Sequence, residues 1–118
     1  MDRRALGAAG EEAAARALVA QGWTLLDRNA RTPSGEIDLV VERKGILGFV
    51  EVKSRRSRAA GTPEEAVDDA KASRVARAAS EYLHRRGLAG ARSEILVAAV
   101  DMDSAGKVVA VRIVPLES

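Results

Sequence analysis

Two stretches of this sequence alternate apolar and polar residues, and only a short segment separates them. Residues 35–42 read GEIDLVVE, and residues 49–53 read FVEVK. This alternation predicts two β-strands, and the short connection allows only a hairpin between them. Lys44-Gly45 is the predicted two-residue turn, because glycine readily adopts the positive φ that tight hairpin turns need.

The predicted turn fixes which residues of the hairpin face each other. It places Asp38 opposite Glu51, and Glu36 opposite Lys53, with all four side chains on one face of the hairpin. A register slip of one residue would separate Asp38 from Glu51. The other face is apolar and is expected to pack on a core; it carries Ile37, Leu39, Val41, Val50 and Val52.

The charged face has a plain structural interpretation, in which it is simply solvated. Glu36 opposite Lys53 suits that interpretation, but Asp38 opposite Glu51 does not, because facing like charges destabilise a ladder by about 0.2–1 kcal/mol. A divalent cation between the two carboxylates would remove the repulsion. The same face also carries three apolar residues, so both faces are expected to be covered and the carboxylates to need a partner. These three are Val40, Leu47 and Phe49.

The spacing of Asp38 and Glu51-Val52-Lys53 resembles the D…ExK signature of restriction-endonuclease-like nucleases. The longer blocks GEIDL at 35–39 and FVEVK at 49–53, followed by Arg55, resemble the YraN-like family of small predicted endonucleases. The resemblance covers most of the chain and includes Gly10-Glu11, Arg28-Asn29, Gly61-Thr62-Pro63 and Lys71. The sequence departs from the pattern in its late strand at 94–97, where leucine stands at a position that tends to carry aspartate.

The resemblance implies an α/β, restriction-endonuclease-like fold with a central mixed sheet flanked by helices, and a Mg²⁺-dependent endonuclease activity on DNA. Asp38 and Glu51 would bind Mg²⁺, for which Mn²⁺ can substitute, and the backbone carbonyl of Val52 is a further candidate ligand. Lys53 would orient the attacking water or stabilise the phosphorane. Glu36 would hold Lys53 in place or bind a second metal ion.

Two helical residues are candidates to complete the site. Glu11 flanks the apolar stripe of the first predicted helix, where archaeal Holliday-junction resolvases of the same fold place a metal-binding glutamate. The alternative interpretation is that Glu11 is an ordinary glutamate at the edge of the buried face of the helix. Lys71 lies near the buried side of its helix, where it would pair with a site carboxylate or a phosphate, or extend to solvent. His84, the only histidine, is expected at the surface near a helix end.

A basic segment leaves the second strand of the hairpin. Arg55, Arg56 and Arg58 are candidates to contact the phosphates beside a scissile bond, or they form a solvated loop. Aromatic residues make up only 3% of the chain, which disfavours a base-stacking platform for single strands. DNA is expected rather than RNA, and a homodimer would suit a branched substrate, with residues 108–111 as a weak candidate edge.

Two other functions fit the same residues. One is a nucleic-acid-binding module that keeps the nuclease fold without cutting. The other is a metal-binding scaffold or assembly subunit that performs no hydrolysis. The intact set of Asp38, Glu51 and Lys53 favours the nuclease, because a module that does not cut is free to lose one of them.

The composition predicts one soluble domain over residues 1–118. The chain is 47% hydrophobic and 31% charged and has no cysteine, which excludes disulfides and thiolate metal sites. No apolar run approaches the roughly 18 residues of a membrane span. Glu11 and Glu12 disfavour a targeting helix, so a cytoplasmic protein is expected.

The remaining elements follow from periodicity and punctuation. A helix over 3–21 ending at Gly22, a strand over 23–26 and a turn over 31–35 precede the hairpin, and a loop over 56–62 follows it. Thr62 and Pro63 predict the start of a helix that ends at Gly87. Strands over 94–101 and 107–114 complete the order αβββαββ. The second helix is expected to bury Val67, Ala70, Val75, Ala78, Ala79, Tyr82 and Leu83.

Overall fold

The computed structural model describes residues 3–56 and 69–116. Its element order confirms αβββαββ, with a five-stranded mixed sheet in the spatial order β1-β2-β3-β4-β5. Only β3 and β4 run parallel, and the connection between them passes through α2. The elements are α1 (Arg3–Ala20), β1 (Thr24–Thr32), β2 (Gly35–Arg43), β3 (Ile46–Arg55), α2 (Asp69–Arg85), β4 (Ser93–Met102) and β5 (Val108–Pro115).

The hairpin of β2 and β3 has the predicted turn. Lys44 and Gly45 have φ values of 53° and 80°, as the two central residues of a type I′ turn require. The predicted register is confirmed from Arg43 opposite Ile46 to Leu39 opposite Val50.

The β2–β3 ladder ends at Leu39, which corrects the rest of the predicted pairing. Asp38 and Glu51 are not ladder partners, and Glu36 faces Arg31 of β1 instead of Lys53 of β3. Beyond Leu39, β2 stays paired with β1 while β3 stays paired with β4 as far as Arg55. The sheet therefore splits at Asp38.

Strand β1 is longer than the predicted strand over 23–26, and it takes in part of the predicted turn over 31–35. Residues 27–31 escape prediction because their side chains do not alternate between apolar and polar. The strand is also irregular, with a shift of register between Leu25 and Asp27 and a φ of 50° at Asn29. Asparagine is one of the few residues that adopt this left-handed conformation at low cost.

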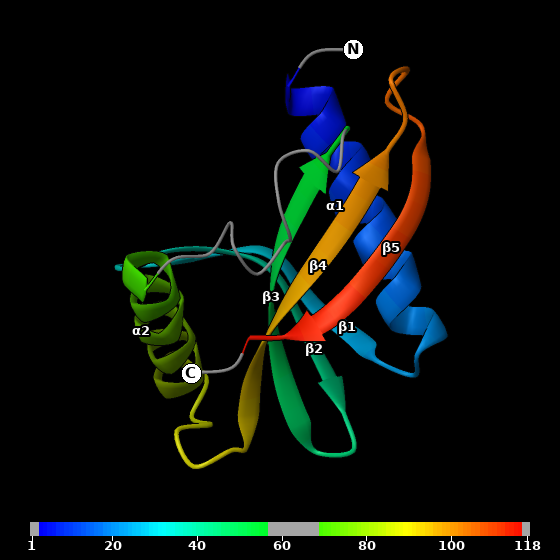
Figure 1. Ribbon diagram of the computed structural model, residues 1–118. Coiled ribbons are helices and arrows are strands. Elements are labelled where there is room, and N and C mark those ends of the chain that lie inside the picture. Colours follow the sequence, from blue (N-terminus) through cyan, green and yellow to red (C-terminus); the bar gives the residue numbers. More distant parts are fainter. Residues whose placement is uncertain (1–2, 57–68, 117–118) are drawn as a thin grey trace.

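The two helices pack on different hydrophobic clusters of the sheet. In Figure 1, α1 lies behind the strands, and α2 stands to one side next to the β1–β2 ribbon. The cluster under α1 includes Leu18, Leu39 and Val50, and the cluster under α2 includes Phe49 and Tyr82. Both faces of β2 and β3 are thus covered, as expected.

Ile37 lies on the other side from its predicted neighbours. It packs with Ala30 and Phe49 in the cluster under α2, whereas Leu39 packs under α1. The β1–β2 ribbon has already left β3 at this point, so the strict alternation that assigned Ile37 to the face of Leu39 no longer applies.

Both helices end where glycine predicts. Gly22 and Gly87 have φ values of 94° and 70°, and the following Trp23 and Leu88 donate backbone hydrogen bonds to Leu18 and Leu83. These are Schellman C-caps. Within the described ranges, no helix is both long enough and apolar enough to cross a membrane.

The burial predicted for the second helix is confirmed from Val75 onward but is wrong at Ala70, which is exposed in the first turn of α2 as described. Near the other helix, Gly10 lets α1 approach β3, because a Cβ there would collide with Ser54. The predicted helix start and one predicted core residue lie outside the described residues; these are Thr62, Pro63 and Val67.

Candidate functional site

Asp38 sits at the point where the sheet splits. The β2–β3 ladder ends one residue after it, and Asn29, the β1 residue on its other side, is not its ladder partner. The carboxylate takes over part of the missing pairing, because Asp38 Oδ2 accepts a hydrogen bond of 2.7 Å from the backbone N–H of Val52. This bond holds Asp38 against β3 although the two strands are separating.

Glu51 is one of two buried charged residues in the described part of the chain, with 7% of its surface exposed. Burial, followed by the negative charge of Asp38, raises the pKa of Glu51 to about 7. Lys71 and Lys53 offset part of this effect, and a side-chain contact with Asp38 adds to it. The predicted meeting of these two carboxylates is therefore observed, through side-chain contact instead of ladder pairing.

Lys53 follows on β3 and is half-buried. Burial lowers the pKa of Lys53, and contact with Lys71 of α2 lowers it further, while Glu51 and Asp38 act in the opposite direction. The structure thus brings Lys53 and Lys71 together beside the acid pair. The predicted pairing of Lys53 with Glu36 is wrong, because Glu36 forms its ion pair with Arg31, at 3.9 Å between Nε and Oε2.

Glu11 of α1 lies near this acid pair. Partial burial, followed by the charges of Asp38 and Glu36, raises the pKa of Glu11. When the Asn29 amide is turned so that its nitrogen faces the carboxylates, it donates to Glu11 Oε1 at 2.9 Å and to Glu36 Oε1 at 3.0 Å. Asn29 thereby joins the helix to β2, and the predicted role of Glu11 as a metal ligand stays a prediction.

The basic residues at and after the end of β3 lie in different environments. Arg55 has only 18% of its side chain exposed and forms an ion pair of 3.2 Å with Asp101 of β4, and its predicted contact with phosphates stays a prediction. Sequence patterns did not predict this ion pair, because Asp101 lies far from Arg55 in the sequence. Arg56 is exposed, as a phosphate-binding residue must be, and Arg58 lies outside the described residues.

The acid pair suits a hard divalent cation. No group of three or more acidic, histidine or cysteine side chains gathers for a metal ion among the residues that the structure describes. Mg²⁺ does not need one, because it usually binds through one or two carboxylates and keeps water or phosphate oxygens as its other ligands. The two carboxylates are in contact and repel each other, and Glu51 is buried and takes up a proton more readily than usual. A bound Mg²⁺ would remove this repulsion.

Sequence reasoning missed two residues of this region. For Asn29, the usable signal is an asparagine in a polar run directly beside the acid-bearing strand. Arg74 lines a cleft with Glu51 and Lys71. Its position three residues after Lys71 on a helix was a usable signal, because residues at that spacing lie on the same helical flank.

Comparison with known proteins places the chain among relatives of similar length. The model of the family described as "Uncharacterised protein family UPF0102" matches residues 10–105. A UPF0102 protein of Symbiobacterium thermophilum is 56% identical over 87 residues, which are 74% of this chain and 73% of that protein. A UPF0102 protein of Moorella thermoacetica is 43% identical over 114 residues, covering 97% of this chain and 95% of that protein.

Among solved structures, the chain is similar to SfsA of Pyrococcus furiosus, which was determined in complex with Ca²⁺. The match has 17% identity and a TM-score of 0.41, and covers 92% of this chain but 62% of the SfsA chain. A likeness this weak carries no conclusion about function. The sequence relatives are decisive, and they confirm the YraN-like resemblance: the chain belongs to the UPF0102 family.

Proposed function

We propose that this protein is a metal-dependent endonuclease that hydrolyses phosphodiester bonds in DNA. The observation that supports it most strongly is the buried Glu51 carboxyl group held against Asp38, with Lys53 and Lys71 beside the pair. A fold gains no stability from burying one acid next to another, and perturbed carboxyl groups of this kind cluster at functional sites. The choice of DNA rests on the resemblance to restriction-endonuclease-like nucleases.

Asp38 and Glu51 would hold Mg²⁺, with the carbonyl of Val52 as a further candidate ligand. When bound, the ion supplies a Lewis acid for the phosphodiester and a water of lowered pKa. The chain fixes its own ligands beforehand: the Val52 N–H orients Asp38, and burial restricts Glu51 to the strand face under α2. This preorganisation means that little rearrangement is needed when the substrate arrives.

Lys53 is the proposed stabiliser of negative charge on the substrate. Its ammonium group lies beside the acid pair and next to Lys71, so the two lysines present N–H donors where phosphate oxygens would gain charge. Orientation of the attacking water by Lys53 is the other role open to it. Glu36, held by Arg31, borders this site as a negative charge instead of anchoring Lys53.

A nuclease screen tests the proposal. Purified protein is incubated with single-stranded, duplex and branched DNA, and with matching RNA, in Mg²⁺ or Mn²⁺. We expect cleavage of at least one DNA structure and its loss in Asp38→Ala and Glu51→Gln. Glu42→Gln is the matched control, because Glu42 is another acid of β2 and its carboxylate caps the far hairpin turn at Gly45, with a hydrogen bond of 2.8 Å.

The outcomes separate the alternatives. If Asp38→Ala cuts as fast as the wild type, the assignment is wrong. Binding without cleavage of any structure would favour the non-catalytic nucleic-acid-binding module. Calorimetry with Mg²⁺ or Mn²⁺ on wild type and Glu51→Ala then shows independently whether the acid pair binds a metal ion.

A further inference from the structure

A cleft of about 390 Å³ lies between α2 and the turn that joins β1 to β2. This is near the lower end of the range of ligand-binding clefts, about 300–1,000 Å³. Glu51 of the acid pair lines it, so the cleft opens directly onto the proposed active site. The other lining residues are Ser34, Gly35, Glu36, Lys71, Arg74, Val75 and Ala78.

Specific contacts hold the walls of this cleft together. Glu81 of α2 accepts two hydrogen bonds from Ser34, one from its backbone N–H at 2.9 Å and one from its hydroxyl at 2.8 Å. Two hydrogen bonds to one carboxylate hold the turn more firmly than a single one would. The turn is therefore fixed to the helix at one end of the cleft.

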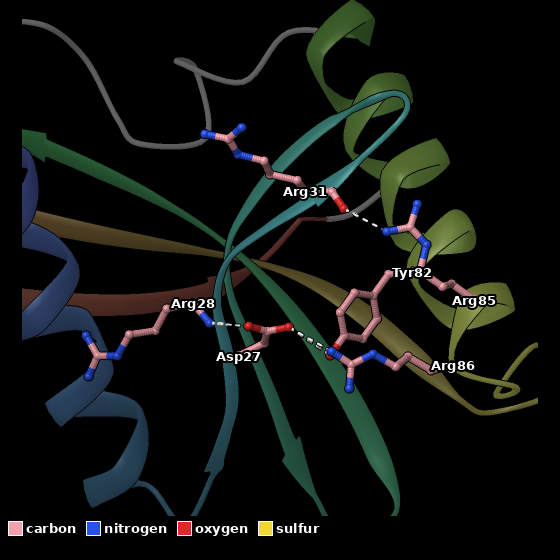
Figure 2. A network of polar contacts seen from close by, with 6 residues as sticks. All are labelled: Asp27, Arg28, Arg31, Tyr82, Arg85 and Arg86. Carbon is pink, nitrogen blue, oxygen red and sulfur yellow. Dashed lines mark hydrogen bonds and ion pairs between the residues drawn. The ribbon is translucent and has the colours of Figure 1, made fainter.

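A second set of contacts ties β1 to the last turn of α2 (Figure 2). The Asp27 carboxylate accepts a hydrogen bond of 3.1 Å from Arg86 and one of 3.5 Å from the Tyr82 hydroxyl. Arg85 reaches the Arg31 carbonyl at 3.4 Å, while the Arg31 side chain points away from this network. These contacts and the Ser34–Glu81 pair all join the C-terminal half of α2 to the β1–β2 ribbon, so helix and ribbon are held together beyond one end of the cleft.

Arg74 of α2 lines this cleft as its arginine. Several other arginines are neutralised: Arg28 by Glu12, Arg55 by Asp101 and Arg86 by Asp27. None of the ion pairs between described residues includes Arg74. Its stem lies on Gly35, with Cδ 3.8 Å from the point that a Gly35 Cβ would occupy. The stem is therefore supported while the guanidinium remains at the cleft.

The charged groups in and beside the cleft favour an anion once a metal ion is bound. Three carboxylates and three cationic groups lie there, and Glu36 already has an ion pair with Arg31, so a divalent cation on the other two acids makes the region net positive. Of the three cations, Arg74 is best suited to hold an anion, because a guanidinium offers a fork of N–H donors that fits phosphate oxygens. The six groups are Glu36, Asp38, Glu51, Lys53, Lys71 and Arg74.

We propose that Arg74 binds a phosphate oxygen of a nucleic-acid strand that occupies this cleft. The inference rests on the proposed function, because it assigns the substrate of the same site. It adds a substrate-binding residue on α2, opposite the acids of β2 and β3. The role of Arg74 is to bind the substrate, and the hydrolysis itself is left to the acid pair and Lys53.

Fluorescence anisotropy with a labelled DNA oligonucleotide, in Ca²⁺ to supply a hard cation, tests this role. Arg74→Ala is expected to weaken binding about 10–100-fold, the range expected for a charge-assisted hydrogen bond. It should also lower the slope of log K against log salt by about one. Arg74→Lys should recover part of the affinity. In cleavage assays with Mg²⁺, Arg74→Ala should raise KM much more than it lowers kcat.

Arg77→Ala is the matched control. Arg77 is also an exposed arginine, one helical turn further along α2, and it does not line the cleft. Its removal should leave the affinity within about threefold of the wild type, as expected of a cation that adds only to the general field. Thermal melting of each variant confirms that α2 remains folded.

The outcomes distinguish this inference from the proposed function. If Arg74→Ala and Arg77→Ala weaken binding equally, the assignment of Arg74 is overturned even if the protein cuts DNA. If binding depends on Arg74 but nothing is cut, the inference stands and the endonuclease proposal fails. A wild-type protein that binds no oligonucleotide in Ca²⁺ or Mn²⁺ overturns the inference outright.

Discussion

Glu51 and Asp101 are the two buried charged residues in the described part of the chain, and they are buried in opposite ways. Asp101 is 5% exposed and has Arg55 beside it in the neighbouring strand, at 3.2 Å. Glu51 is 7% exposed and has another carboxylate, Asp38, beside it. The fold pairs one buried acid with an opposite charge, and it places a like charge, only partly offset by Lys71 and Lys53, beside the other.

This difference indicates which acid is structural. Burying a charge is costly unless it is paired, and a paired acid such as Asp101 joins two strands. One oxygen of Asp101, Oδ2, has no hydrogen-bond partner, so even this pair is imperfect. For Glu51, Lys71 and Lys53 offset only part of the effect of burial and of the Asp38 charge, and a cation from solution would supply the rest. The comparison therefore supports the proposal that Glu51 is the functional acid and Asp101 a structural one.

The largest expected effect is on cleavage. Glu51→Gln should lower the rate at least about 1,000-fold, because a catalytic metal ion contributes several kcal/mol and each tenfold in rate is about 1.36 kcal/mol. Asp101→Asn, assayed at a temperature where it is folded, should keep most of the activity. Initial rates on the best DNA substrate measure both. Equal losses in the two variants would remove the distinction between the two buried acids.

The next effect is on stability, and it concerns Arg55. Arg55→Ala leaves Asp101 buried without its cation and should cost about 3 kcal/mol, near the low end for a broken buried pair. Urea unfolding measures the loss. Replacing both partners with apolar residues, as Arg55→Met with Asp101→Leu, should restore most of it. A loss below about 1 kcal/mol in Arg55→Ala would show that solvent already replaces the arginine.

In the absence of metal, Glu51→Gln should raise the stability of the fold, whereas Arg55→Ala lowers it. The folded-state pKa of about 7 lies above the ordinary 4.5, so between these values the folded protein keeps a proton that the unfolded chain releases. Stability is therefore lost as the pH rises through this window. At pH 8 without metal, Glu51→Gln should be more stable than wild type by roughly 2–3 kcal/mol.

Two measurements check the origin of that gain. The gain should disappear below pH 4.5, where Glu51 is protonated in both folded and unfolded states. Mg²⁺ should stabilise the wild type and leave Glu51→Gln nearly unchanged, because only a ligand that binds the folded state raises stability. A gain that persists at pH 4 would trace to packing instead of charge.

The sequence predicted the parts of the site that depend on local signals. The Lys44-Gly45 turn pins the hairpin register, so Asp38 and Glu51 meet even though the ladder ends before them. It also predicted Gly22 and Gly87 as helix ends, because a left-handed residue is needed there. Each of these rests on a few neighbouring residues.

The other contacts depend on long-range pairing and were not predictable. The Arg55–Asp101 pair needs the parallel register of β3 and β4, which no local pattern encodes. Because the sheet splits at Asp38, β2 pairs there with β1 and not with β3, so Glu36 lies opposite Arg31 instead of Lys53. Alternation gives the face of a residue only while its strand stays in one sheet.

The smallest expected effect concerns the exposed ion pair of Arg31 and Glu36. This pair shows how much an arginine–carboxylate contact contributes to stability when it is not buried. Its groups are 3.9 Å apart, with the arginine side chain 91% exposed and the glutamate 45% exposed. Arg31→Ala should change the stability by less than about 0.5 kcal/mol, because water screens exposed pairs. Urea midpoints of Arg31→Ala and Arg55→Ala, measured together, compare an exposed and a buried arginine–carboxylate pair directly. A cost above about 1 kcal/mol would show that the hydrogen bonds from Asn29 to Glu36 and Glu11 depend on Arg31. The link that Asn29 forms between α1 and the acid pair would then be weaker than its geometry indicates.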